Sequence, residues 1–296
     1  MERTSAMDRL YPGVSLLFFV CAVGGTLLLD HPLFRLISLC GALCCHAVLC
    51  PGKALRFLLR GALPLCAFAA LLNPLFNHRG VHILFYFPWG NPCTGESLLY
   101  GVMSACLLLS VLLWFRCYTA VMTSEKGLFL FSRAAPSLTL LLRLCLRFLP
   151  AFRRALERTR DAQTGLLGPP KTKREALRRA FTAFQTRLRA ALTNAIAVSD
   201  AMRSRGYGLP GRTVYSRFAL HERDKLCLPF LLCVALTVCG AYAAGLLRFE
   251  YFPAPHGAEL TPLALFCALL YSLLCFFPVI LQRLEVSKWR TLPSKT

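Results

Sequence analysis

The sequence predicts an all-α, polytopic membrane protein with about six transmembrane helices and a long cytoplasmic helical region. Hydrophobic residues make up 56% of the 296 residues, and the mean hydropathy is +0.54. Lys and Arg residues gather in alternate connections between apolar runs. Six runs without Lys, Arg, Asp or Glu approach the ~20 residues that cross a bilayer as a helix, and they are residues 10–29, 36–52, 61–77, 97–115, 226–247 and 260–282.

The first four spans are expected within residues 1–122. The first run lacks a clear small-residue cleavage site and another span follows it, so a span is expected and not a cleavable signal. Pro32 suits the first turn of the second helix. The two shortest runs can be extended at Arg35 and Arg60, because a long arginine side chain can snorkel to the interface. An aromatic belt at the interface is predicted before the fourth span, built from Phe85, Tyr86, Phe87 and Trp89.

Positive charge sets the expected topology. Residues 123–224 hold 20 of the 34 Lys and Arg residues, whereas the connections 30–35, 77–96 and 248–259 are poor in cations. The positive-inside rule then places both termini in the cytoplasm, in a multi-pass protein of the cell membrane. The net charge of +20 is thereby explained by topology, and nucleic acid is not an expected partner.

The cytoplasmic region 123–224 precedes a third region, 225–296, which holds the last two spans and the tail. Residues 137–152 are rich in leucine but carry Arg143 and Arg147, four residues apart and therefore on one helix face. Because two arginines would be costly in a spanning helix, an amphipathic helix at the membrane boundary is expected, disturbed near its end by Pro150. The pair Pro169-Pro170 predicts a break.

Residues 173–205 are expected to form one long helix or two. Apolar side chains recur there at spacings of three and four, which predicts a stripe that is buried against something: Leu177, Phe181, Phe184, Leu188, Leu192 and Ile196. Two explanations stay open, namely packing within the chain and docking of a partner.

The segment ends in Ala201-Met-Arg-Ser-Arg-Gly-Tyr207, with Arg205 directly before Gly206. Glycine tolerates the left-handed conformation that closes a helix, so a helix C-terminus is predicted there. The arginine either satisfies free carbonyls as part of the cap or presents its fork of donors to a partner.

Motifs of common enzymes are missing from the sequence. It has no GxxxxGK[ST] loop, no HExxH and no GxSxG. The spelling GxGxxG begins at Gly206, but it follows a helix and is interrupted by Pro210, unlike a dinucleotide site. His78 and His82 have helical spacing in a segment that does not look helical. The protein is therefore not expected to be an enzyme, to bind a cofactor or to hold a metal.

Five fragments together resemble the transmembrane T-component of energy-coupling-factor (ECF) transporters, a family of ABC-type importers. The similarity covers about residues 25–225 and depends on the order, spacing and membrane context of the fragments. These are His31-Pro32-Leu33, Asn73-Pro74-Leu75-Phe76 with Gly80, the run TGESLLYG at 94–101, the run LCLRFLP at 144–150, and Ala201–Tyr207.

The resemblance implies a scaffold that couples two ATP-binding-cassette ATPase subunits to a substrate-binding membrane subunit, the S-component. The transported substrate would be a vitamin or a transition-metal ion. It also implies cytoplasmic coupling helices that end in two ATPase-docking motifs. The second maps onto Ala201, Arg205, Gly206 and Tyr207, and the first, which has lost its Arg-Gly pair, onto Ala162, Gln163, Leu166 and Leu167. The substrate-binding subunit would meet the stripe at Leu177, Phe181, Phe184 and Leu188.

Two other classes of function stay open. The first is an unrelated polytopic scaffold or permease without an ATPase partner. The second is a membrane-embedded enzyme, for which the sequence offers no catalytic constellation. Association with ATPase subunits separates the T-component from both.

Overall fold

A computed structural model describes residues 6–49, 58–77, 80–86, 92–132, 134–210, 218–252, 256–257 and 261–291. The chain forms two compact units. Residues 1–126 and 218–296 form one, here called the membrane unit, and residues 127–217 form the other, the hairpin unit. The first and third of the predicted regions therefore fold largely together.

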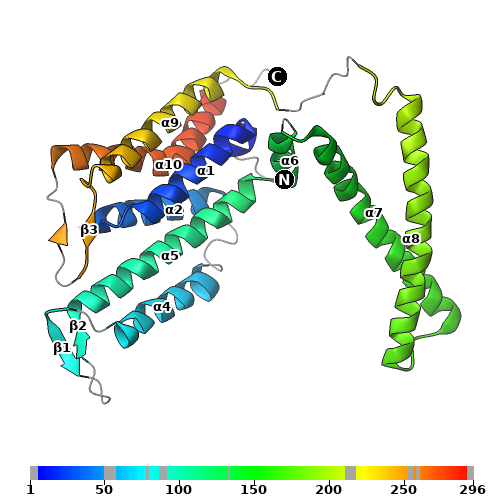
Figure 1. Ribbon diagram of the computed structural model, residues 1–296, viewed down its shortest axis with the longest axis horizontal. Helices are drawn as coiled ribbons and strands as arrows, with labels where there is room; N and C mark the ends of the chain where they lie inside the picture. Colours follow the sequence, from blue (N-terminus) through cyan, green and yellow to red (C-terminus); the bar gives the residue numbers. More distant parts are fainter. Residues whose placement is uncertain are drawn as a thin grey trace. The chain divides into compact units, whose positions relative to one another are not determined.

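The membrane unit contains a helix at each of the six apolar runs (Figure 1). Among the described residues, four helices are long and apolar enough to cross a membrane: α2 (Pro32–Leu49), α5 (Gly95–Val121), α9 (Glu222–Ala243) and α10 (Pro262–Thr291). The other two are shorter, namely α1 (Pro12–Leu28) and α4 (Leu63–Phe76), which follows the π-helical turn η2 (Leu58–Ala62). The 17 residues of α1 span about 25 Å, less than the ~30 Å of a hydrocarbon core. The all-helical membrane class is thus borne out, while the count of six spans stays a prediction.

The part of the chain that the structure describes also contains two short antiparallel strand pairs. β1 (Ile83–Tyr86) pairs with β2 (Pro92–Thr94), and β3 (Phe249–Glu250) pairs with β4 (His256–Gly257). Sequence periodicity did not predict them, because strands of two to four residues are too short to show a pattern. The predicted aromatic belt lies partly here: Tyr86 is exposed, and Phe87 and Trp89 lie outside the described residues.

Trp114 of α5 lies at the centre of the membrane unit and is fully buried. Its ring makes an edge contact with Phe18 of α1 at a centroid distance of 5.7 Å. Its indole Nε1–H donates to Ser38 Oγ of α2 at 3.0 Å, and Ser38 Oγ lies 2.6 Å from Thr26 Oγ1 of α1. The Tyr271 hydroxyl of α10 completes the group, 3.2 Å from Thr26 Oγ1. These hydrogen bonds satisfy polar groups that would be costly to bury unpaired, and they join four helices.

Arg35 corrects one expectation. Its side chain does not snorkel but is buried, with 5% of it exposed. It pairs with Asp30 at 2.9 Å, and its guanidinium carbon lies 5.6 Å from the centroid of the Tyr251 ring. The Tyr251 hydroxyl donates to the Asp30 carbonyl at 2.7 Å. The connection between α9 and α10 therefore covers this arginine, an arrangement that local sequence could not reveal.

The end of α4 is tied to the start of α5 by residues from two of the resembling fragments. The Asn73 amide donates to the Ser97 carbonyl at 3.1 Å, and the Ser97 hydroxyl donates to the Asn77 carbonyl at 2.6 Å. One turn further along α5, Gly101 lies against the backbone of α4, because a Cβ there would sit 2.6 Å from the Ala70 carbonyl oxygen. The two helices can approach this closely only because position 101 has no side chain.

We expect Gly101→Ala to destabilise the membrane unit by about 1–3 kcal/mol, because the added methyl must push α4 away from α5. The measurement is the midpoint of thermal unfolding in detergent micelles. Gly24→Ala in α1 is the matched control, since a Cβ there meets nothing within 4 Å. The control should be neutral or stabilising because alanine favours the helix by up to ~1 kcal/mol. Equal shifts in both variants would contradict the close contact.

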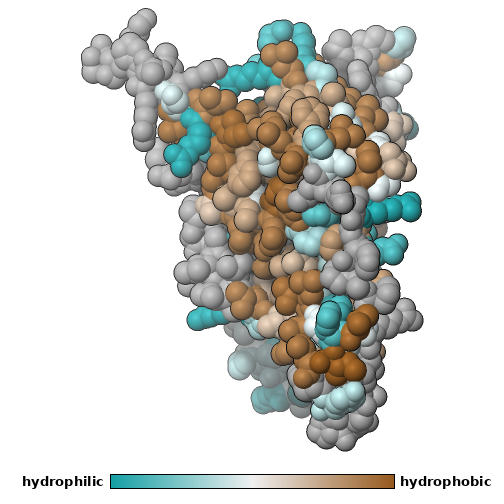
Figure 2. Space-filling view, turned by 90° about the vertical axis from the view of Figure 1, so that its left-hand side faces the viewer, coloured by the Kyte–Doolittle hydropathy of each residue, from teal (hydrophilic) through white to brown (hydrophobic). Residues whose placement is uncertain are grey.

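Exposed large apolar side chains occur on each of the six helices α1, α2, α4, α5, α9 and α10, among them Phe68, Leu71, Leu236 and Leu269. Figure 2 shows hydrophobic residues spread over the side of the molecule that faces the viewer, with hydrophilic ones toward its margins. Such a surface is unusual for a protein in water and suits contact with lipid.

The hairpin unit consists mainly of two 32-residue helices, α7 (Pro136–Leu167) and α8 (Lys173–Ser204). The shorter α6 (Ser124–Phe131) crosses the boundary between the units. The break at Pro169-Pro170 is confirmed, and residues 173–205 form one helix and not two. The expected disturbance at Pro150 was wrong, because α7 continues through it for 17 residues. A proline costs one backbone hydrogen bond, and the strong helix formers after it, such as Ala155, Leu156 and Glu157, sustain the helix.

Candidate functional site

The second predicted docking motif lies at the end of α8 and has a Schellman geometry. The Tyr207 N–H donates to the Met202 carbonyl at 3.0 Å, and the Gly206 N–H donates to the Arg203 carbonyl at 2.9 Å. Gly206 has φ +79°, which confirms the predicted left-handed residue. The backbone therefore closes this helix by itself.

This geometry bears on the two interpretations of Arg205. Since backbone N–H groups already occupy the carbonyls at the helix end, the arginine is not needed as a cap. Its side chain is exposed and makes no ion pair with any residue that the structure describes. Tyr207 beside it is exposed as well, and Ala201 lies exposed one turn earlier. A planar cation with five donors thus stands at the tip of a rigid helix.

The first predicted motif lies at the end of α7. Ala162 and Gln163 lie in its last two turns, and Leu166 and Leu167 form its end, before Gly168 with φ +70°. Leu166 is 86% exposed and Leu167 is also exposed. The first motif thus presents two exposed leucines, whereas the second motif presents an arginine and a glycine. The 32 residues of α8 separate the two motifs, a length of about 48 Å.

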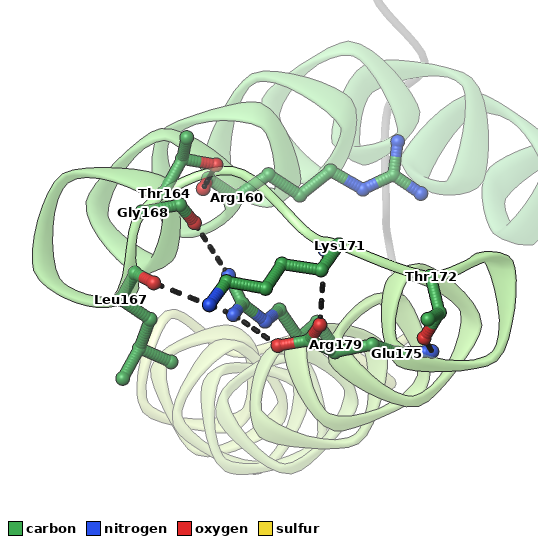
Figure 3. Close-up of polar contacts among 8 residues, drawn as sticks. All are labelled: Arg160, Thr164, Leu167, Gly168, Lys171, Thr172, Glu175 and Arg179. Atoms are coloured by element: carbon green, nitrogen blue, oxygen red, sulfur yellow. Dashed lines mark hydrogen bonds and ion pairs between the residues drawn. The ribbon is translucent and has the colours of Figure 1, made fainter.

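Sequence reasoning missed a network of hydrogen bonds and an ion pair, here called the polar lock, that holds the turn between α7 and α8 (Figure 3). The Arg179 guanidinium donates to the Gly168 carbonyl at 2.7 Å and forms an ion pair with Glu175. Glu175 also accepts from the Lys171 N–H at 3.0 Å, while its own N–H donates to Thr172 Oγ1 at 3.3 Å. The spacing of Thr172 and Glu175 is that of a capping box, the one sequence signal that could have revealed this lock.

A hollow of about 360 Å³ lies beside the lock, between the last turns of α7 and the start of α8. Its lining combines cations, polar groups and small residues: Arg160, Gln163, Thr164, Pro170, Ala176, Arg179 and Ala180. Figure 3 shows that the Arg160 side chain points away from the Arg179 network. Both arginines line the hollow, but Arg160 is exposed, whereas Arg179 is bonded to Gly168 and Glu175.

The hydrogen bond from the Lys171 backbone, followed by the ion pair with Arg179, holds the pKa of Glu175 below its ordinary value. A lowered pKa in the folded state stabilises the turn above the unfolded pKa, near 4.3, and that stabilisation is lost as the pH falls through the folded pKa. We therefore expect amide exchange across residues 168–176, corrected for intrinsic rates, to accelerate below about pH 4. Glu175→Gln should accelerate exchange already at pH 7. Glu157→Gln, at an exposed acid of α7, is the control and should have no effect on this segment at pH 7.

Beyond the turn, α8 packs on α7 through apolar contacts and a hydrogen bond from Arg187. Ala183 is fully buried, and Arg187 donates to the Thr159 hydroxyl. Phe152 of α7 makes an edge contact with Phe184 at a centroid distance of 6.1 Å. These contacts join the second half of α7 to the first half of α8, and the helices diverge away from their connecting turn (Figure 1).

Apart from Phe184 at its edge, the apolar stripe of α8 lies on a different face, and α7 leaves it uncovered. Leu177 is 73% exposed and Phe181 is 61% exposed. The remaining members, Phe184, Leu188, Leu192 and Ile196, are all more than 40% exposed. Packing against α7 therefore does not explain the stripe. The described residues of the hairpin unit leave the stripe exposed.

The described residues contain no group of three or more His, Cys, Asp or Glu side chains placed to hold a metal ion. Of the two helically spaced histidines, His78 lies outside the described residues, and His82 lies next to strand β1. No model of a known protein family matches the chain, and no curated protein matches it either.

Proposed function

We propose that this protein is the transmembrane T-component of an ECF-type importer, coupling an ATPase pair to a substrate-binding membrane subunit. The observation that carries the proposal is the end of α8, where a backbone-closed helix presents Arg205, exposed and without an ion pair to any described residue. A charge-assisted contact at such a tip is a strong, oriented attachment. The unbroken α8 behind it can transmit the movement of an ATPase as a rigid body.

The separation of the two motifs supports docking of two subunits. About 48 Å of helix lies between the end of α7 and Arg205, so two ATPases can bind without competing for one surface. The end of α7 would dock through apolar contacts of Leu166 and Leu167, with Arg160 beside them as the charged group. The two attachments would thus be chemically different.

The uncovered stripe of α8 provides the surface for the substrate-binding subunit. Large exposed apolar side chains in a row along a helix are the pattern of helix-in-groove recognition, in which a partner covers the apolar face. Leu177, Phe181 and Leu188 are the proposed anchors, with Phe184 at the edge toward α7. The imported substrate would be a vitamin or a transition-metal ion, held by that subunit.

The proposal requires the hairpin unit and both termini to be cytoplasmic, as the charge asymmetry predicts. Reporter fusions after Tyr207 and after Ser294 should both report the cytoplasm, and a fusion within the connection between α9 and α10 should report the outside. A fusion after Tyr207 that reports the outside would exclude ATPase docking at Arg205.

The experiment that tests the proposal is copurification. The tagged protein, expressed from its own genomic neighbourhood in a native host, should bring down ATPase subunits with P-loops and a small membrane protein. Loss of a motif arginine at the end of α7 favours a second candidate, a scaffold without an ATPase partner. Purification of the intact protein with membrane partners but no ATPase would favour the scaffold without an ATPase partner.

A further inference from the structure

The first half of α7 combines a very wide apolar surface with two arginines. Six of its large apolar side chains are exposed, each between 43% and 61%, whereas Leu140 and Leu144 are partly buried; the six are Leu138, Leu141, Leu142, Leu146, Phe148 and Leu149. Successive residues of an α-helix are rotated by about 100°. On that projection the apolar positions from Leu140 to Leu146 occupy an arc of about 240°, and Arg143 and Arg147 share the remaining sector.

α8 does not cover this surface. The α7 side chain with a ring contact to α8 is Phe152, and the hydrogen bond to Arg187 comes from Thr159, further along the helix. Between Pro136 and Phe152 the only buried side chain is Thr139. A neighbouring protein helix covers about one face of another, so an arc of 240° is too wide for a single partner helix. Acyl chains, in contrast, can surround such an arc.

Charge indicates the chemistry of the remaining sector. No Asp or Glu occurs from residue 136 to residue 156. Arg143 and Arg147 are exposed and form no ion pair with any described residue. Four residues apart on a helix, their Cβ atoms are about 6 Å from each other. Two guanidinium groups at that spacing match the oxygens of a phosphate group, which arginine binds in bidentate fashion.

We propose that the first half of α7 lies in the surface layer of the bilayer, with its apolar arc among acyl chains and Arg143 and Arg147 on the phosphates of anionic phospholipids. Chain connectivity permits this, since α7 begins 15 residues after the membrane-spanning α5 ends. The site goes beyond the proposed coupling function and does not depend on an ATPase partner. It would anchor one helix of the hairpin unit to the lipid surface.

The test uses the full-length protein in nanodiscs of phosphatidylcholine with increasing fractions of phosphatidylglycerol brominated in its acyl chains. A fluorescent amino acid is placed at Leu141, on the side of α7 opposite the arginines, or at Thr186 of α8 as the solvent control. Quenching is expected at position 141 and not at position 186. Each arginine is expected to contribute roughly a fivefold preference for anionic lipid at the surface.

Arg143→Ala combined with Arg147→Ala should therefore raise the phosphatidylglycerol fraction at half-maximal quenching at least fivefold, and the double lysine variant should restore part of the preference. Arg174→Ala with Arg178→Ala is the matched control, an exposed pair of equal spacing on α8. The proposal would be overturned if no quenching occurred at position 141. It would also be overturned if the quenching changed neither with the fraction of anionic lipid nor on loss of Arg143 and Arg147. Failure of ATPase copurification would leave it standing, so the two proposals can fail separately.

Discussion

Arg205→Ala should abolish stable association with an ATPase subunit and the substrate uptake that depends on it. If the guanidinium pairs with a carboxylate or with carbonyls in a groove of the ATPase, the substitution leaves that partner unpaired. The cost is roughly 2–5 kcal/mol for a buried pair, or about 30-fold to several thousand-fold in affinity. Because the backbone closes α8 without this side chain, helix stability should be unchanged. Circular dichroism of the purified variant checks that point.

Three further variants separate the parts of this effect. Arg205→Lys keeps the charge but loses the planar fork, so it should rescue association only in part. Gly206→Val should also impair association, because φ +79° is unfavourable for a β-branched residue. Leu166→Ala at the other motif removes no charge and should weaken polar docking less. The measurements are ATPase copurification and uptake in all four variants. Wild-type assembly and uptake by Arg205→Ala would refute the docking role of this arginine.

A charged residue in the stripe of α8 should prevent capture of the substrate-binding subunit. In Leu177→Asp, Phe181→Asp or Leu188→Asp, a large apolar contact is lost and a charge faces an apolar partner. Loss of such a contact costs on the order of 2–4 kcal/mol. Pull-down of the substrate-binding subunit should fall accordingly, and ATPase association should persist because the end of α8 is intact.

Thr186→Asp is the matched control for these variants. It adds the same charge to the same helix on another face, where Thr186 is exposed and its hydroxyl donates to the carbonyl of Thr182. Its pull-down should equal that of the wild type. If the stripe variants retain both partners, the stripe is not a docking surface for the substrate-binding subunit, and the role of Arg205 is unaffected.

Local patterns in the sequence were sufficient to predict where the helices lie. Apolar runs predicted the helices α1, α2, α4, α5, α9 and α10, because a long uncharged run has few alternatives to helix once backbone groups must be satisfied internally. Their ends were less predictable: Pro12 and Pro32 confine α1 to 17 residues. At Pro150 the sequence predicted a disturbance, but α7 continues through this residue because neighbouring helix formers outweigh its effect. The two strand pairs left no pattern because they are so short.

The sequence by itself determined the membrane class, the break at Pro169-Pro170 and the left-handed Gly206, since each depends on residues that are neighbours in the chain. The tertiary structure alone decided that Arg35 is buried under Tyr251, that Glu175 and Arg179 lock the α7–α8 turn, and that α7 leaves the stripe of α8 uncovered. Those outcomes depend on which faces meet. An apolar stripe looks the same in a sequence whether its own chain or a partner covers it, because periodicity records the face of a helix and not its neighbour.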